Sequence, residues 1–226
     1  MPAEGRTARD ERRRRLGQNF LRPQAAERFV FQAGVRPGEV VIDIGAGSGA
    51  LCRALVARGA EVLAVEVDPV WAAQLRALAR TEGLRHISVL ETNFLTWPLP
   101  ERPFRVLACP PFGATTAILH RLLDNPEIPL VRADLVVQWE VARKRASGPP
   151  GSLLSVTWAP WWEFRLGPRL RANQFRPVPR VDGGTLVITR RSPPLLPASM
   201  APAYNDFVRR HWPFPSQPTV TPGPSW

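Results

Sequence analysis

The chain has 226 residues, 44% of them hydrophobic, and carries 30 lysine and arginine residues against 19 aspartate and glutamate residues, a formal net charge of +11. This length suits one domain of ordinary size, and no apolar run approaches the roughly 18 residues of a membrane span, so we expect no membrane association. Two cysteines are too few for a disulfide framework, and no apolar stretch follows the basic N-terminus, so we expect a cytoplasmic protein without a secretory signal.

The N-terminal segment is strongly basic, since residues 1–15 contain six arginines and almost no apolar side chain. Such a segment cannot bury enough apolar surface to offset the entropy that is lost on ordering. We therefore expect a flexible arginine-rich arm over residues 1–15 and a folded domain over residues 16–192. Prolines become frequent after this domain, so residues 193–226 are expected to form a short helical appendage and a proline-rich tail.

From about Gly38 onward, short β-branched runs alternate with longer amphipathic runs. The predicted strands cover residues 39–44, 61–67, 87–91, 104–109 and 133–139, and the predicted helices cover residues 48–58, 69–80 and 115–123. This alternation predicts an α/β fold with a parallel sheet covered by helices. Two further runs, residues 153–161 and 184–189, are interpreted as an antiparallel strand pair that closes the sheet. In the last part of the chain, residues 203–212 have apolar side chains at helical spacing.

A glycine-rich turn lies between the first predicted strand and the first predicted helix, and it contains Gly45, Gly47 and Gly49. Glycine permits positive φ and lets the backbone approach a ligand, while the amides at a helix N-terminus favour anionic groups. Glu66 ends the next strand, at about the spacing where an acid meets ribose hydroxyls in dinucleotide folds. The alternatives are a tight turn without a ligand and an ordinary solvated carboxylate.

The third and fourth predicted strands also end in polar or unusual residues. Asn93 follows the third strand and offers amide donors and an acceptor to an adenine ring, although it is equally typical of a turn or cap. After the fourth strand come Cys109, Pro110, Pro111 and Phe112. The two prolines stiffen this loop and are expected to aim Phe112 outward, as a surface on which a base can stack, rather than into the core.

These motifs, together with two others, resemble the Erm family of 23S ribosomal RNA adenine N-methyltransferases. The resemblance covers roughly residues 16 to 192 and is carried by Gly17-Gln18-Asn19-Phe20-Leu21, the loop from Asp43 to Gly49, Glu66, Pro110-Pro111-Phe112-Gly113, Val137-Gln138-Trp139-Glu140-Val141-Ala142-Arg143-Lys144-Arg145 and Phe175-Arg176-Pro177-Val178-Pro179-Arg180-Val181-Asp182. It implies a Rossmann-like class I methyltransferase sheet with a short C-terminal helical appendage. It also implies a 23S rRNA adenine as the substrate and resistance to macrolide, lincosamide and streptogramin B antibiotics.

The resemblance further implies S-adenosyl-L-methionine as the methyl donor and assigns roles to individual residues. Gln18 and Asn19 are expected to line the methionine end of the cofactor, Glu66 its ribose, and Phe112 the target adenine. The full set expected to bind the cofactor is Gln18, Asn19, Leu21, Gly45, Gly47, Glu66, Val67, Asn93 and Cys109. The residues expected to act in catalysis are Cys109, Pro110 and Phe112, the first two through main-chain carbonyls that accept from the target amine.

Two positions depart from the family pattern, since Asn93 replaces an aspartate and Cys109 replaces an asparagine. A carboxamide can still accept from an adenine amine, but a thiol is a weak hydrogen-bond acceptor. Two alternatives to an active rRNA methyltransferase therefore stay open. One is a protein that binds the cofactor and RNA with weak or lost catalysis, and the other is a methyltransferase that acts on small molecules.

The remaining expectations concern partners. The excess of positive charge favours a polyanion, and phosphate contacts are expected from the arm, from Arg143, Lys144 and Arg145, and from Arg176 and Arg180. A solvated helix face is the alternative for the first cluster. The histidines and cysteines show no spacing typical of metal ligands, so we expect no metal, and we expect a monomer.

Overall fold

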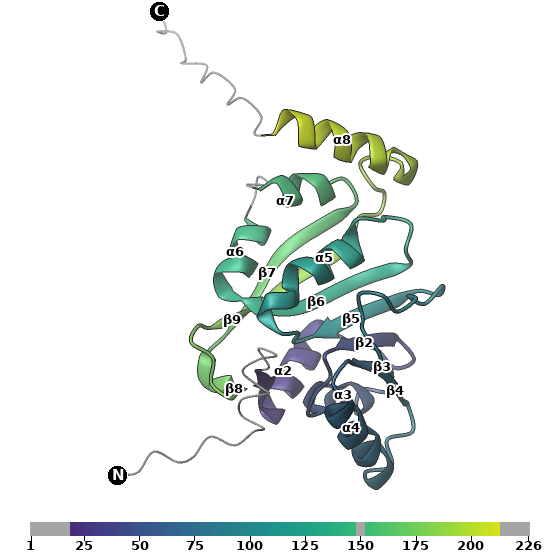
Figure 1. The fold of residues 1–226 in the computed structure, drawn as a ribbon, viewed down its shortest axis with the longest axis vertical. Coiled ribbons are helices and arrows are strands. Elements are labelled where there is room, and N and C mark those ends of the chain that lie inside the picture. Colours follow the sequence, from purple (N-terminus) through teal and green to yellow (C-terminus); the bar gives the residue numbers. More distant parts are fainter. Residues whose placement is uncertain (1–18, 148–151, 213–226) are drawn as a thin grey trace, which may run out of the picture.

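We describe the protein from a computed structural model that covers residues 19–147 and 152–212 in detail (Figure 1). The expected arm at residues 1–15, Gln18 and the tail beyond residue 212 lie outside the described residues. Within them, the main sheet has seven strands in the order β4-β3-β2-β5-β6-β9-β7. The strands are β2 (Val40–Ile44), β3 (Glu61–Glu66), β4 (Ile87–Glu91), β5 (Phe104–Ala108), β6 (Leu130–Gln138), β7 (Trp162–Leu170) and β9 (Gly183–Arg190).

The sheet is parallel from β4 to β6, and β9 runs antiparallel between β6 and β7. The strand order reverses between β2 and β5, because the chain leaves β2 for β3 on one side and returns to β5 on its other side. In an open parallel sheet, the crevice at such a reversal lies at the carboxyl ends of the strands and is the usual ligand site. The predicted Rossmann-like α/β sheet is confirmed, and its four N-terminal strands lie where the sequence places them.

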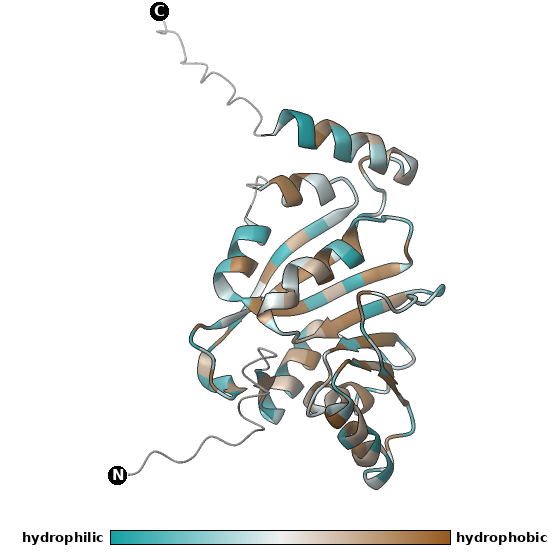
Figure 2. Cartoon of the chain, viewed as in Figure 1, coloured by the Kyte–Doolittle hydropathy of each residue, from teal (hydrophilic) through white to brown (hydrophobic). Residues whose placement is uncertain are grey.

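Helices cover both faces of the sheet. One buried cluster joins the sheet to α2 (Pro23–Ala33), α3 (Ala50–Val56) and Leu75 of α4 (Pro69–Thr81). The other joins it to α5 (Thr115–Leu123) and to Ala142 of α6 (Trp139–Ala146). Adjacent residues of β6 alternate between the two clusters, since Val136 belongs to the first and Val137 to the second. The apolar colour of the inner strands in Figure 2 follows this burial on two faces.

The strand prediction for residues 153–161 was wrong. Leu153–Trp158 forms α7, and the strand that pairs with β9 at the edge of the sheet is β7, which begins at Trp162. Ser152 explains the difference, because its side chain accepts from the main-chain N–H of Ser155 at 3.3 Å and so caps the helix. A short apolar run fits a buried helix as well as a strand, and the capping serine decides between them here.

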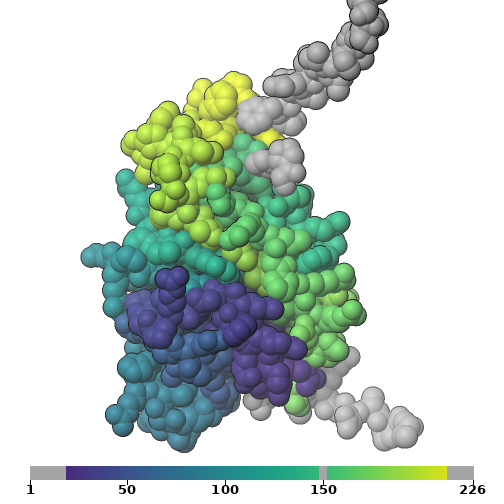
Figure 3. Space-filling view, turned by 180° about the vertical axis from the view of Figure 1, so that it is seen from behind, coloured from purple at the N-terminus to yellow at the C-terminus, as the bar shows by residue number. Residues whose placement is uncertain are grey.

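Two N-terminal elements were not predicted. α2 follows the usual rules, with Pro23 in its first turn, buried Ala26, Phe29 and Val30 at helical spacing, and Gly34 at φ 63° after its end. Ahead of it, β1 (Phe20–Leu21) pairs antiparallel with β8 (Phe175–Arg176). The space-filling view accordingly shows the purple N-terminal segment bordering green residues from late in the chain (Figure 3).

The C-terminal part of the described chain is a helix that packs on α7. The predicted helix at residues 203–212 is present as α8 (Ala201–His211), at the far end of the molecule from α4 (Figure 1). The Tyr204 hydroxyl donates to the Val156 carbonyl at 3.2 Å, and the Tyr204 ring meets the Trp161 ring edge-on at 5.7 Å. None of the helices in the described residues is long and apolar enough to cross a membrane.

Candidate active site

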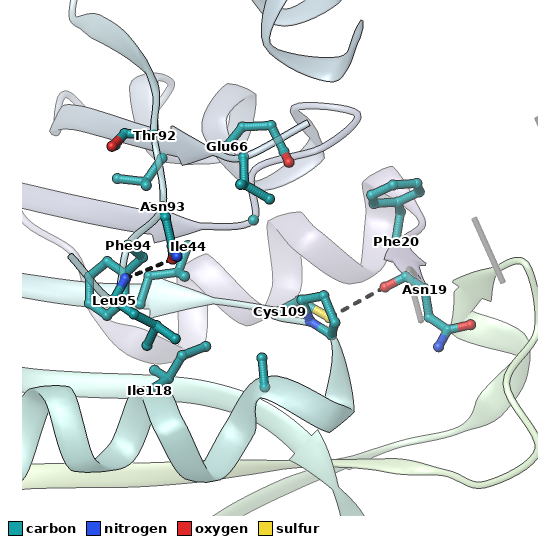
Figure 4. A pocket seen from close by; sticks show the side chains of 15 residues that line it. Asn19, Phe20, Ile44, Glu66, Thr92, Asn93, Phe94, Leu95, Cys109 and Ile118 are labelled. Carbon is teal, nitrogen blue, oxygen red and sulfur yellow. Dashed lines mark hydrogen bonds between the residues drawn. The ribbon is translucent and has the colours of Figure 1, made fainter. Parts of the chain in front are cut away.

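A pocket opens at the carboxyl ends of β2, β3, β4 and β5 (Figure 4). The empty space of the pocket, including the part that is open to solvent, is about 760 Å³. Its lining is mostly apolar with a few polar groups, and it comprises Asn19, Phe20, Ile44, Gly45, Val65, Glu66, Val67, Thr92, Asn93, Phe94, Leu95, Cys109, Pro111, Ala114 and Ile118. The pocket therefore draws on the N-terminal segment and on the ends of four neighbouring strands.

The glycine-rich turn after β2 forms one wall of the pocket. Gly45 and Gly47 have φ angles of 73° and 48°, a conformation that side chains disfavour. Space is also short at Gly47, where an added Cβ would lie 2.1 Å from Cε1 of Phe20. At Gly45 an added Cβ would lie 3.6 Å from Cδ of Pro111, so the turn faces the loop after β5 across the pocket.

The Glu66 carboxylate is fixed at the end of β3. Only 2% of the residue is exposed. Its Oε2 accepts from the main-chain N–H of Gly47 and its Oε1 from that of Asp68, both at 2.9 Å. Burial raises the pKa of Glu66, and the two main-chain donors partly oppose that rise. Each oxygen keeps a further lone pair, so the carboxylate can accept from two hydroxyls of a ligand.

Asp43 lies behind the glycine turn and does not line the pocket. It is 1% exposed, and its Oδ2 accepts from the thiol of Cys52 at 3.2 Å. Burial raises the pKa of Asp43 to about 7, and the nearby Glu66 carboxylate adds to the rise, while the Cys52 hydrogen bond opposes it. The pKa of Cys52 is also raised, chiefly by burial. This pair therefore lies beneath the turn, and neither residue is among those that line the pocket.

Asn93 forms the opposite wall through a local turn. Its Oδ1 accepts from the main-chain N–H of Leu95 at 3.0 Å, shown as a dashed line in Figure 4. Because a main-chain N–H only donates, the carboxamide oxygen must face Leu95 and the Nδ2 group must face elsewhere. The sequence left two alternatives for Asn93, a residue that stabilises a turn or one that lines the cofactor site. In the structure Asn93 both stabilises a turn and lines the pocket.

The loop after β5 closes the pocket with Cys109 and Pro111. The Cys109 thiol donates to the main-chain oxygen of Asn19 at 3.7 Å (Figure 4). Burial raises the pKa of Cys109, and the charge of Asp43 adds to the rise, so the thiol keeps its proton. A protonated thiol that already donates to Asn19 is a poor acceptor for a substrate amine.

Phe112 follows directly and stands at the rim. Its ring is half-buried and meets the Phe175 ring edge-on at 6.5 Å. Its carbonyl accepts from the Thr115 hydroxyl at 2.9 Å, and the Pro111 carbonyl accepts from the N–H of Ala114 at 2.8 Å. These bonds hold a 3₁₀ turn (Phe112–Ala114) against the start of α5 and so fix the position of a ring that is partly exposed.

The structure brings most of the residues predicted from sequence to this pocket. Those that line it are Asn19, Gly45, Glu66, Val67, Asn93 and Cys109, and Gly47, Pro110 and Phe112 adjoin it. Leu21 is 4% exposed and belongs to the core beneath. Sequence reasoning did not single out Phe20, Thr92, Leu95 or Ile118 as lining residues. Phe20 sits inside a motif that was recognised, whereas Ile118 reaches the pocket only because α5 packs under the loop.

The basic clusters differ in how free their arginines are. Arg143 pairs with Glu140 at 2.7 Å, and Arg145 donates to the Ser152 hydroxyl at 2.7 Å while lying over the Trp158 ring. Arg145 therefore helps to hold α7, which the sequence did not indicate. Arg176 and Arg180 are exposed. No group of three or more His, Cys, Asp or Glu side chains in the described residues could hold a metal ion.

Comparison with known families identifies one that spans most of the chain. A model described as "Ribosomal RNA adenine dimethylase" matches residues 9–212. An rRNA adenine N-6-methyltransferase of Corynebacterium diphtheriae is 36% identical over 192 residues, which cover 85% of this chain and 74% of that protein. The mycinamicin-resistance protein MyrB of Micromonospora griseorubida is 40% identical over 200 residues, which cover 87% of this chain but 62% of that protein.

A solved structure supports the same assignment. The crystal structure of the 23S rRNA methyltransferase ErmE superposes with a TM-score of 0.73 at 34% identity, over 84% of this chain and 78% of that one. A dimethyladenosine transferase from Plasmodium falciparum has a TM-score of 0.68 at 18% identity, which shows the shared fold alone. The chain is shorter than several of its relatives, and spans little more than half, 54%, of the Saccharopolyspora erythraea rRNA adenine N-6-methyltransferase that it matches.

Proposed function

The chain belongs to the ribosomal RNA adenine dimethylase family, and from this premise we propose that it transfers a methyl group from S-adenosyl-L-methionine to the exocyclic amine of an adenine in 23S rRNA. The observation that supports the proposal is the position of Phe112, a partly exposed aromatic ring on a proline-stiffened turn beside the pocket at the carboxyl ends of the strands. The relatives named for rRNA adenine methylation and for mycinamicin resistance support the substrate class. We further propose that this methylation confers resistance to macrolide, lincosamide and streptogramin B antibiotics.

The residues that line the pocket support the proposed cofactor. Val67 is 61% exposed and Leu95 is 39% exposed, yet both line the pocket, so an apolar ligand face such as a purine would cover them. The fixed Glu66 carboxylate has lone pairs for two ribose hydroxyls, and the Asn93 Nδ2 group can donate to a ring nitrogen. Asn19 and the glycine turn would contact the methionine end of the cofactor. When bound, S-adenosyl-L-methionine supplies an electrophilic sulfonium methyl group.

Phe112 would hold the target base. A base in a folded RNA must leave its stack to reach the pocket, and a flat aromatic surface stabilises it outside. The edge-on contact with the buried Phe175 ring would help to keep the Phe112 ring in place when a base stacks on it. The exposed π-face also tolerates the positive charge that develops on the attacking amine.

The loop after β5 would supply the hydrogen-bond acceptors for the reaction. The adenine amine is a poor nucleophile, because its lone pair is delocalised into the ring, so alignment and acceptors for its hydrogens must provide most of the catalysis. The Cys109 thiol is a donor here, since it points to the Asn19 carbonyl. The acceptors we propose are the main-chain carbonyls of Cys109 and Pro110, which the prolines hold in place.

The test is to express the chain in macrolide-sensitive bacteria and to map methylated adenines on their 23S rRNA. We expect one modified adenine and increased resistance in cells with the natural chain. Cells that express Phe112→Ala at the same level serve as the control and should show much less of both. Unmodified 23S rRNA in cells that contain folded protein would contradict the proposal.

The engaged thiol of Cys109 favours one second candidate, a protein that binds S-adenosyl-L-methionine and RNA but methylates slowly or not at all. The two candidates differ in one measurement. Tight binding of both ligands, with no transfer of labelled methyl to RNA in a single-turnover assay, would select the second.

A further inference from the structure

A second hollow on the surface lies where the N-terminal segment meets the end of β7. It is lined by Arg22, Gln24, Ala25, Arg28, Arg169, Arg171, Asn173 and Gln174. Four of these side chains are guanidinium groups and three are carboxamides, while none of these described lining residues carries a carboxylate. We call this surface the arginine hollow. Such a lining offers many hydrogen-bond donors and a strong positive field, and it would bind an anion with several acceptor oxygens.

The backbone of the arginine hollow is firmly held. The main-chain N–H of Arg22 donates to the Gln174 carbonyl at 2.8 Å, and its Nε donates to the Asn173 carbonyl at 2.9 Å. The Gln174 Oε1 accepts from the N–H of Arg171 at 2.8 Å. The hollow is therefore a fixed shape, formed because β1 and β8 pair across most of the chain.

The charges in the hollow are only partly neutralised. Arg169 pairs with Asp182 at 2.8 Å and lies over the Trp139 ring. Arg28 and Arg171 are exposed, and among the residues that the structure describes no carboxylate lies within ion-pair distance of either. Asp182 also interacts electrostatically with Arg171, but the four arginines of the lining leave the hollow positively charged, so it attracts anions.

The hollow adjoins the place where the target base would lie. Gln174 in its lining is followed by Phe175, whose ring meets that of Phe112 at 6.5 Å. Arg22 in its lining is separated by one residue from Phe20, which lines the cofactor pocket. An RNA strand that presents its base to Phe112 would therefore have neighbouring phosphates within reach of these arginines.

We propose that the arginine hollow binds backbone phosphates of the RNA next to the methylated adenine, with Arg28 and Arg171 as the contacting residues. This assignment rests on the proposed function. The contact positions the RNA and does not read its sequence, because phosphates are the same at every nucleotide. Arg22 and Arg169 shape the hollow, since their guanidinium groups are engaged with the protein.

The test compares two double variants of equal charge. Arg28→Ala with Arg171→Ala removes the proposed contacts, and Arg80→Ala with Arg85→Ala removes two exposed arginines near the end of α4. The equilibrium constant for binding protein-free 23S rRNA is measured over a range of salt concentrations, together with kcat and KM for methylation. Thermal unfolding and S-adenosyl-L-methionine affinity verify that each variant is folded.

For the hollow variant we expect the slope of log K against log salt to become shallower by about two, or about one per lost phosphate contact. KM for RNA should rise at least several-fold with kcat nearly unchanged, and the α4 variant should match the natural protein in both. Equal slopes in all three proteins would overturn the assignment, as would equal losses in the two variants. If the natural protein neither binds nor methylates 23S rRNA, the proposed function itself fails and the assignment falls with it.

Discussion

The thiol of Cys109 donates to the main-chain oxygen of Asn19 across 3.7 Å, and this contact closes the pocket between the N-terminal segment and the loop after β5. The thiol therefore acts as a hydrogen-bond donor, at a position where the related enzymes are expected to have an asparagine.

Cys109→Asn should speed methyl transfer. An asparagine Nδ2 group can replace the thiol as donor to Asn19, which leaves the new Oδ1 as an acceptor for the target amine. Loss of one such charge-stabilising contact typically costs on the order of 2.7–4 kcal/mol in the barrier, or about 10²- to 10³-fold in rate, so restoring it should give a measurable part of that factor. Single-turnover methylation of 23S rRNA is the measurement. Cys109→Ala is the control, and a rate for the asparagine variant no higher than that of the natural protein would show that the main-chain carbonyls suffice.

Phe112→Ala should lower methyl transfer by roughly ten- to a hundredfold, since stacking on one aromatic ring is worth about 1–3 kcal/mol per base. S-adenosyl-L-methionine affinity should hardly change, because Phe112 adjoins the pocket without lining it. Phe112→Tyr should keep most of the activity. Phe31→Ala, which removes another exposed ring on α2, is the matched control. An alanine variant at position 112 with unchanged turnover would rule out the stacking role.

Gly47→Ala should destroy cofactor binding and lower stability. The added Cβ would lie 2.1 Å from the Phe20 ring, and the residue would keep a φ of 48° that alanine disfavours. Because the ring of Phe20 leans on Trp71, with centroids 4.8 Å apart, it cannot move away freely. Gly113→Ala is the control, since an added Cβ there meets nothing within 4 Å. Titration calorimetry with S-adenosyl-L-methionine and thermal unfolding would record both effects; equal behaviour of the two variants would contradict the tight fit.

Asp43→Asn should become more stable relative to the natural protein as pH rises. The pKa of Asp43 is raised from 3.8 to about 7 in the folded protein, so the folded state binds this proton more tightly than the unfolded state does. Its contribution is therefore fully present below about pH 4 and is lost as pH rises through 7, to a total on the order of 4 kcal/mol. An asparagine at position 43 does not titrate, so the variant does not lose this stability as pH rises. The measurement is the free energy of unfolding of both proteins by denaturant at pH 5 and at pH 8. Glu66 is present in both proteins, so its own titration cancels from the comparison. A stability difference that is the same at the two pH values would argue against a buried, protonated Asp43.

The local parts of this fold and site follow directly from the sequence. Gly45 and Gly47 lie between a β-branched run and a helical run, so the turn, the helix after it and the acid at the next strand end can all be placed by short-range patterns. The loop with Pro110 and Pro111 can also be predicted from local sequence, because proline restricts the backbone independently of the rest of the fold.

Contacts between distant segments were not predictable in this way. The sequence gives no sign that Cys52 hydrogen-bonds to Asp43, or that the Cys109 thiol faces Asn19, because each contact depends on how helices and loops pack. The arginine hollow has the same origin, since its two halves are brought together by pairing between β1 and β8. At residues 153–161 the error was local, because an apolar run was read without its capping Ser152.

The β1–β8 pairing also bears on when the protein becomes competent during its own synthesis. Arg22 and Asn173, which are 151 positions apart, must both have left the ribosomal tunnel before their hydrogen bond forms. A nascent chain that has emerged only as far as β6 already contains the glycine turn and Glu66, but it has no partner for Phe20 and Leu21. The pocket is therefore completed only after β8 has been synthesised, well after the glycine turn and Glu66 have left the ribosome.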